Sequence, residues 1–304
     1  MNIKLYNQFL KFILILIGIV ILGPTFFGVL GLLFPAFGYF PSLGNNDFSI
    51  KYFYDLFLIP GISKSILLSF STGFFSTILA LLFSQIILLS IFNTKFYYYL
   101  KIIISPLLAM PHITMAVGLI FLLSPSGLIF RLLSPWLTGF NRPPDFFIIP
   151  DEYGLSLILG LILKETPFFL LASMAAIEQF PANKIFKIGK SLQHSNFSTW
   201  SLLIFPNLYK RIRLVIFIVI AFTSSVIDMA VLLAPSTPST LSIRILQIYQ
   251  SVDLDSIFIA SSLALLQVFI ITILILFWFT LEKIIKKKFF FLFIIKILPR
   301  KKSL

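Results

Sequence analysis

Three ionisable side chains lie inside long apolar blocks of this 304-residue chain, at Lys164, Glu165 and Asp228. An ionisable side chain in the middle of a bilayer costs at least about 2.5 kcal/mol and usually faces protein or a water-filled path. A helix separates sequence neighbours by about 100° around its axis, so Lys164 and Glu165 cannot pair face to face. Two interpretations stay open. The three charges line or gate a polar translocation path, or they form an inter-helix salt bridge, with Lys164 or Asp228 as a partner, that fixes packing.

No other side chains assemble into a recognisable reaction centre. The chain has two histidines and no cysteine, so metal-ligand spacings, disulfides and thiol chemistry are not available. His112 is interpreted as a packing histidine and His194 as an exposed loop residue. No nucleophile–base–acid set and no phosphate-binding glycine-rich loop occur. We therefore expect no catalytic residue, metal or cofactor on this chain, and any ATP would be bound by a partner.

Composition decides which solvent the chain requires. Hydrophobic residues make up 59% and charged residues 12%, with a mean hydropathy of +1.03. A soluble domain carries about 25% charged residues, so this chain must use lipid as its solvent. The net charge of +13 is confined to the gaps and ends of apolar blocks. That pattern is typical of topology determinants and lipid headgroup contacts, and it argues against nucleic acid as a partner.

Six apolar blocks are each long enough to cross a bilayer as a helix. With both termini on one side, 18 Lys and Arg residues lie on that side, 5 lie on the other, and Lys164 lies inside a span. The positive-inside rule then places both termini in the cytoplasm. The predicted fold is an all-α, polytopic membrane helix bundle. Its six transmembrane helices are expected at 9–34, 66–92, 100–123, 154–177, 212–233 and 257–281, the first being an anchor rather than a cleaved signal peptide.

Prolines predict irregularities within these spans. Pro106 and Pro111 lie in the third block and Pro167 in the fourth. Proline in a span frees a carbonyl and kinks the helix, which either is a tolerated packing feature or opens space between helices.

Two segments outside the spans carry their own signals. The external segment 124–153 is rich in proline, and its stretch 126–138 is predicted to form a short helix on the membrane, with Trp136 at headgroup level. The tail from Lys283 alternates cationic clusters with Phe-rich runs. It is predicted to be a membrane-surface helix or tail, because it is too short and too charged for a seventh span.

The polar interruption 183–206 lies between the fourth and fifth blocks. Asn183 is the predicted N-cap of a first short helix, and Ser195 or Asn196 that of a second. Gly189 leaves room for a close approach. Exposed apolar residues on such helices are costly in water, so the helices either dock on a partner or lie on the lipid surface. The first helix has an apolar face of Ile185, Ile188 and Leu192 and a basic face of Lys184, Lys187 and Lys190.

This interruption resembles the cytoplasmic loop by which permease subunits of binding-protein-dependent ABC importers engage their ATPase. The family signature is a Glu-Ala-Ala triplet, a Gly four residues later, and then Ile-x-Leu-Pro. With Pro206 as the anchor, the ending fits, the Gly position falls on Gln193, and the triplet falls on 187–189. The Glu and the central Gly are absent. The coupling residues implied by the resemblance are Lys187, Ile188, Gly189, Leu192, Gln193, Phe205 and Pro206.

Other stretches extend the resemblance from about Ile62 to the end of the last span. The segment 111–119 is similar to the family's Pro-His segment. The segments 155–167 and 226–238 are similar to the thiamine-type subgroup, which is related to iron and polyamine permeases. Permeases of that subgroup often contain two such modules in one polypeptide, and this chain is similar to the first module.

The resemblance implies a permease subunit of a type I ABC importer in the bacterial inner membrane. An N-terminal span and external segment (1–61) would precede the permease domain (62–281) and a basic cytoplasmic tail (282–304). The implied partners are a cytoplasmic ATPase that binds the ATP, a second permease half on a separate chain, an external substrate-binding protein and the lipid bilayer. The implied substrate is thiamine-like, iron or a polyamine.

Two alternatives belong to other classes. An ion-coupled secondary carrier would use Glu165 and Asp228 as its proton or sodium relay and would not need the 183–206 loop. A membrane scaffold would leave the intramembrane charges unexplained. Uptake that depends on ATP and not on ion gradients would distinguish the importer from the carrier.

Overall fold

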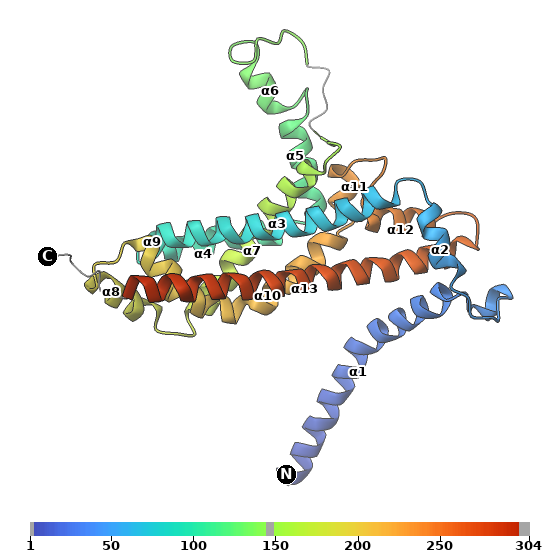
Figure 1. Cartoon of the computed structure of the whole chain (residues 1–304), viewed down its shortest axis with the longest axis horizontal. Helices are drawn as coiled ribbons and strands as arrows, with labels where there is room; N and C mark the ends of the chain where they lie inside the picture. Colours follow the sequence, from blue (N-terminus) through green and yellow to red (C-terminus); the bar gives the residue numbers. More distant parts are fainter. Residues whose placement is uncertain (1–2, 144–148, 298–304) are drawn as a thin grey trace. The chain divides into compact units, whose positions relative to one another are not determined.

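The computed structural model describes residues 3–143 and 149–297, and its regular secondary structure in these ranges is helical (Figure 1). A single isolated bridge, between Phe40 and Asn45, is the β-type pairing within them. The prediction of an all-α fold is therefore confirmed. The elements are α1 (Ile3–Ala36), η1 (Pro41–Leu43), α2 (Lys51–Leu58), α3 (Ile62–Ile91), α4 (Phe96–Ala109), α5 (His112–Leu123), α6 (Leu128–Leu133), α7 (Leu155–Ile177), α8 (Ala182–Ser191), α9 (Asn196–Thr199), the π-helix η2 (Trp200–Ile204), α10 (Phe205–Ser225), α11 (Ala230–Leu233), α12 (Leu241–Tyr249) and α13 (Ser256–Ile297).

Five segments of the described chain are long and apolar enough to cross a membrane, by length and composition. The polytopic helical architecture is thus confirmed. The helix α10, which covers the first part of the predicted fifth span, is not among the five, because Lys210, Arg211 and Arg213 lie near its start. The five segments are Gln8–Ala36, Ile62–Ile91, His112–Leu133, Leu155–Ile177 and Ser256–Ile285.

Two predicted spans are each divided into two helices. The span 100–123 is interrupted between α4 and α5, where Met110 and Pro111 are extended with ψ angles of 128° and 147°. Proline lacks an N–H and disfavours helical geometry in the preceding residue, so Pro111 ends α4. The span 212–233 is interrupted between α10 and α11, where Val226 is extended. The other two predicted kink positions, Pro106 and Pro167, lie inside α4 and α7.

The chain divides into two compact units, of which the first comprises Met1–Ser63 and Arg244–Phe269. Its centre is Phe258, which is fully buried and stacks on Tyr52 with ring centroids 4.8 Å apart. The Phe40 ring meets Phe258 edge-on. The Ser262 hydroxyl lies 3.1 Å from the Ala36 carbonyl oxygen, to which it can donate. Aromatic stacking therefore holds the segment after α1 against the first part of α13.

The second unit comprises Lys64–Ile243 and Ile270–Leu304, and within it α3 and α10 approach closely. A Cβ atom on Gly73 would lie 2.6 Å from the Cβ of Ser224. One turn further along α3, the hydroxyls of Thr77 and Thr223 lie 3.1 Å apart and are buried. Small and hydroxylated residues at a crossing let two membrane helices come together and bond across the interface.

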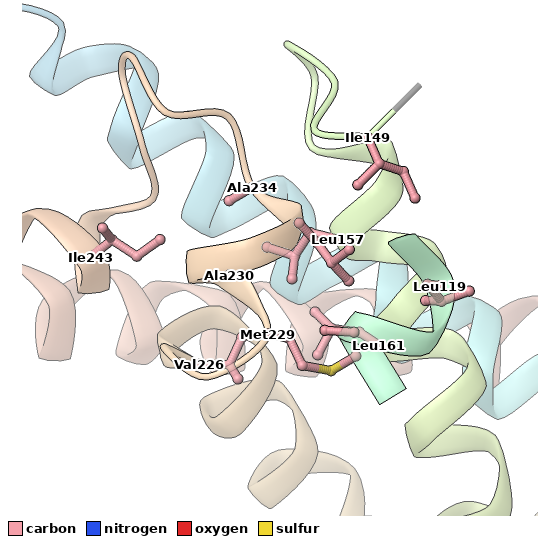
Figure 2. Close-up of a cluster of buried hydrophobic side chains, with 11 residues drawn as sticks. Leu119, Ile149, Leu157, Leu161, Val226, Met229, Ala230, Ala234 and Ile243 are labelled. Atoms are coloured by element: carbon pink, nitrogen blue, oxygen red, sulfur yellow. The ribbon is translucent and has the colours of Figure 1, made fainter. Parts of the chain in front are cut away.

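A buried apolar cluster joins α5, α7 and α11 in the same unit (Figure 2). Leu119 of α5 faces Leu157 and Leu161 of α7, and Met229 packs beside them from the connection that leads to α11. Gly160 allows this contact, since a Cβ there would lie 2.6 Å from Leu233 Cδ1. The broken ends of both divided spans are thus packed against α7.

The start of α7 is held by the Asp151 carboxylate. One carboxylate oxygen accepts hydrogen bonds from the amides of Leu155 (2.8 Å) and Tyr153 (3.1 Å), and the other from the amide of Ser156 (2.6 Å). The first amides of a helix have no partner within the helix, so a carboxylate at this end stabilises it.

The helix α13 continues past the predicted end of the last span. It runs without interruption from Ser256 to Ile297, so its described part includes the predicted basic segment from Lys283. The last span and the beginning of the tail are therefore one helix. Whether this part lies on the membrane surface stays a prediction.

Candidate functional site

The 183–206 loop forms two short helices that lead directly into α10. The first, α8, begins at Ala182, with Pro181 at its N-cap position. The prediction that Asn183 is the N-cap is therefore wrong. Pro181 has a φ of −75° and precedes the first helical residue, where the N–H that it lacks takes no part in the helical hydrogen bonds. The second helix, α9, is capped by Ser195, whose hydroxyl accepts the Ser198 amide at 3.1 Å, in agreement with one of the two predicted caps.

Gly189 is the point at which the two helices touch. It is buried, and a Cβ atom there would lie 2.5 Å from Thr199 Cγ2 and 2.7 Å from Thr199 Oγ1. No side chain fits at these separations unless Thr199 moves. The angle between α8 and α9 therefore depends on glycine at this position.

Aromatic side chains fix this helix pair to the end of α3. The Phe92 ring meets Phe186 of α8 and Trp200 of η2, each at 5.3 Å between ring centroids. Trp200 is almost fully buried. The inward side of the helix pair is thus part of the protein core.

The outward side of the helix pair is apolar as well. Ile188, Leu192 and Phe197 expose 57%, 63% and 69% of their surface. Lys187 and Lys190, on the same helix as Ile188, are also exposed. We call Ile188, Leu192 and Phe197 the coupling patch. Of the predicted apolar face, Ile185 is half-buried and does not contribute fully to this patch.

Gln193 occupies the turn between α8 and α9 in a left-handed conformation, with a φ of 59°. The backbone N–H of Gln193 donates to the Lys190 carbonyl at 2.9 Å, and the backbone N–H of His194 donates to the Gly189 carbonyl at 3.0 Å. These two bonds are the Schellman arrangement that ends a helix, in which glycine normally takes the left-handed position. Gln193, at the position of the glycine in the family signature, thus has the left-handed backbone conformation that favours glycine.

The last two predicted coupling residues begin α10. Phe205 is half-buried and contacts the Tyr209 ring at 5.8 Å, whereas Pro206 is exposed in the first turn. The π-helix η2 joins α9 to α10 directly, so the loop and α10 are one continuous stretch of helix. Helices of the π type are rare and occur frequently at functional sites.

Lys164 binds the backbone carbonyls at the C-terminal end of α4. It is 5% exposed, and its ammonium group donates to the carbonyl oxygens of Leu107 (3.2 Å), Leu108 (3.1 Å) and Met110. These carbonyls lie at the end of α4, where the break at Pro111 leaves them without helical partners. A cation at a helix C-terminus is also favoured by the helix dipole. The geometry therefore supports a packing role for Lys164.

Glu165 meets a partner that the sequence reasoning did not assign. Its carboxylate lies 3.9 Å from His112 Nε2, and 7% of the Glu165 side chain is exposed. The His112 ring lies 5.0 Å from the ring of Phe222. The sequence signal that could have found this pair is the position of His112 directly after the Pro111 break.

Asp228 lies apart from the Lys164 contacts. It is exposed in the non-helical connection between α10 and α11, close enough to His112 to act on it electrostatically. The structure thus brings Lys164, Glu165 and His112 together at the start of α5 and places Asp228 on a neighbouring segment.

An ion pair between partly exposed Arg213 and buried Glu282 links α10 to α13. Arg213 Nε lies 3.1 Å from a Glu282 carboxylate oxygen, to which the Tyr209 hydroxyl donates at 3.3 Å. The Trp278 indole donates to the Tyr209 hydroxyl at 2.8 Å. Glu282 is 7% exposed. We call these four residues the Glu282 network; nothing in a single sequence pairs residues so far apart.

The described residues contain no group of three or more His, Asp or Glu side chains that could hold a metal ion.

Comparison with known proteins identifies the class. The chain is 24% identical over 207 residues to the inner membrane ABC transporter permease protein YnjC of Escherichia coli K12, an alignment that covers 68% of this chain and 39% of that protein. The chain thus spans well under half the length of this relative. Its structure matches, with a TM-score of 0.68 and 17% identity, a chain of a bacterial ABC transporter involved in the import of the acidic polysaccharide alginate. That match covers 92% of this chain and 97% of the other.

The fold is therefore that of an ABC importer permease, and the resemblance predicted from the sequence is confirmed at this level. The chain is a multi-pass inner-membrane protein. No protein-family model matches it. The thiamine-type subgroup stays a prediction.

Proposed function

We propose that this chain forms half of the translocation path of an ATP-driven importer and couples to a cytoplasmic ATPase through residues 183–206. The observation that carries the proposal is the coupling patch: Ile188, Leu192 and Phe197 are exposed on a helix pair whose other side is anchored in the core. Flexible loops do not hold three apolar side chains outward, whereas a rigid helix pair does.

The energetics favour docking of this patch on a protein. Full burial of a side chain of this size contributes about 1.5 to 3 kcal/mol, so three that are more than half exposed offer several kcal/mol to a partner. Helix-in-groove recognition uses this kind of amphipathic helix. The exposed Lys187 and Lys190 add a positive charge that an acidic groove rim would complement.

The partners follow from this assignment. The ATPase supplies ATP binding and hydrolysis, because no phosphate-binding loop was found in the sequence. A second permease half on a separate chain completes the path. An external substrate-binding protein delivers a substrate that is thiamine-like, iron or a polyamine. Lys164 sets the packing of α4 against α7, while Glu165 and Asp228 lie at or near the path.

Movement passes from the loop into the spans in two steps. The loop continues through η2 into α10 without a flexible connection. The Glu282 network then joins α10 to α13 near the same end of the unit. Closure of the ATPase would displace both helices together and switch the path between inward- and outward-facing states by rigid-body rocking.

The proposal is tested by substitutions in the coupling patch, made in the complete transporter. The variants Ile188→Asp and Phe197→Asp are compared with Leu254→Asp, which changes an equally exposed apolar residue, 70% exposed, in another segment. Co-purification in mild detergent should lose the ATPase for the first two variants and keep it for the third, with all three chains inserted at normal levels. Retention of the ATPase by both patch variants would contradict the proposal.

The ion-coupled carrier is the competing function, and the contact of buried Glu165 with His112 is the observation that favours it. Uptake that collapses with the proton or sodium gradient while ATP is maintained would establish the carrier. Uptake that follows ATP alone would exclude it.

A further inference from the structure

The external segment between α5 and α7 carries a feature that the importer function does not use. The stretch His112–Leu133 is long and apolar enough to cross a membrane and includes both α5 and α6, so α6 lies at one end of this candidate span. The described residues after it, up to Pro143, therefore belong to the membrane boundary.

The tip of this segment exposes large apolar side chains. Leu132, Trp136 and Leu137 are 70%, 90% and 79% exposed. In water this surface would be costly, whereas at a bilayer surface it is stabilising. Tryptophan in particular prefers the headgroup level, where its ring is apolar and its N–H finds a polar partner.

A hollow of about 240 Å³ lies beside this tip, and Arg131 and Arg142 are among the residues that line it. Ser134 and Asn141 line the same hollow. No ion pair joins either arginine to a carboxylate among the described residues. Planar guanidinium groups bind phosphate oxygens in a bidentate manner, and hydroxyl and amide groups can donate to the same oxygens.

We propose that this hollow binds the headgroup phosphate of an anionic phospholipid in the outer leaflet, with Arg131 and Arg142 on the phosphate and Leu132, Trp136 and Leu137 in the interface. Charge complementarity and the continuity with a span favour a lipid over an acidic protein surface. The site anchors α6 and the residues that follow it, up to Pro143, at a fixed depth.

The experiment measures bound lipid on the full-length chain. The chain is reconstituted in phosphatidylcholine with and without phosphatidylglycerol, purified in mild detergent, and its retained lipid is identified by native mass spectrometry. The variant Arg131→Gln/Arg142→Gln is compared with Lys51→Gln/Lys64→Gln, which removes two exposed cations at other positions. Retained phosphatidylglycerol should fall about tenfold in the arginine variant and stay unchanged in the lysine variant.

Tryptophan fluorescence provides a second readout. The part of the signal that is lost in Trp136→Phe should be quenched by lipids brominated near the headgroup. Equal phosphatidylglycerol retention by the wild type and the arginine variant would overturn the proposal. Displacement of the lipid by inorganic phosphate alone would also overturn the proposal. The same holds for a Trp136 signal that brominated lipids do not quench and an external binding protein does.

Discussion

Gly189 offers the sharpest test of the loop geometry, through the change Gly189→Ala. The new methyl group would lie 2.5 Å from Thr199 Cγ2 and 2.7 Å from Thr199 Oγ1. Overpacking of this kind costs about 1 to 3 kcal/mol. Alanine also has a higher helix propensity than glycine, which offsets about 1 kcal/mol of this loss. Gly189→Ala alone should therefore lower stability by up to about 2 kcal/mol.

The companion change Thr199→Ala isolates the clash. It removes both close atoms and leaves Thr199 Cβ, which lies at 3.1 Å. It also removes a buried hydroxyl that has no hydrogen-bond partner among the described residues, so the change itself should cost little. In this background Gly189→Ala should become neutral or stabilising. The interaction free energy of the two changes equals the cost of the clash.

The assay is thermal unfolding of the purified full-length chain in detergent. Tryptophan fluorescence reports on the site because Trp200 is buried beside it. An equal loss of stability in both backgrounds would refute the proposed contact between Gly189 and Thr199. The larger replacement Gly189→Leu should abolish uptake while the chain remains inserted, and normal uptake by that variant would exclude the coupling role of the loop.

Three further outcomes are expected. Gln193→Gly should increase the free energy of unfolding by about 1 kcal/mol, and with it the unfolding temperature, because glycine adopts a φ of 59° without strain. Transport by this variant should be unchanged. Lys164→Met should lower stability by roughly 2 to 4 kcal/mol, since it leaves three carbonyls at the end of α4 without their donor, and membrane abundance should fall with it. For Asp151, burial raises the pKa, but hydrogen bonds from Ser156 and from the amides of Leu155 and Tyr153 outweigh it and lower the pKa below its ordinary value. Its stabilisation is therefore complete above about pH 4 and is lost as the pH falls through the folded-state pKa. Asp151→Asn should be less stable by about 1 kcal/mol at neutral pH, and the difference from the wild type should vanish in acid.

Features that depend on local chemistry could be predicted from the sequence. The apolar blocks indicated the membrane helices, and the polar interruption with Ser195 indicated a second capped helix. Pro111 marked an irregularity, although the sequence suggested a kink and the structure has a complete break. The assignment of Asn183 as a cap failed because the helix begins earlier, at Ala182, with Pro181 at the N-cap position.

Features that depend on the partner of a side chain could not be predicted. Lys164 binds backbone carbonyls, which every residue has and which therefore leave no trace in the sequence. The pairing of Arg213 with Glu282 requires knowing that α10 and α13 lie side by side. In the sequence, Gln193 is only a residue that replaces the glycine of the ABC permease signature. Its left-handed backbone conformation, which glycine favours, explains why the spacing of that signature is kept.

The contact between Lys164 and α4 has a consequence for synthesis of the chain. The carbonyl oxygens at the end of α4 enter the membrane 54 to 57 residues before the ammonium group that binds them. An unpaired carbonyl in lipid costs several kcal/mol, and so does an unpaired ammonium group. Neither partner can therefore settle in lipid alone. We therefore expect α4 to reach its final place in the bundle only after α7 has been synthesised.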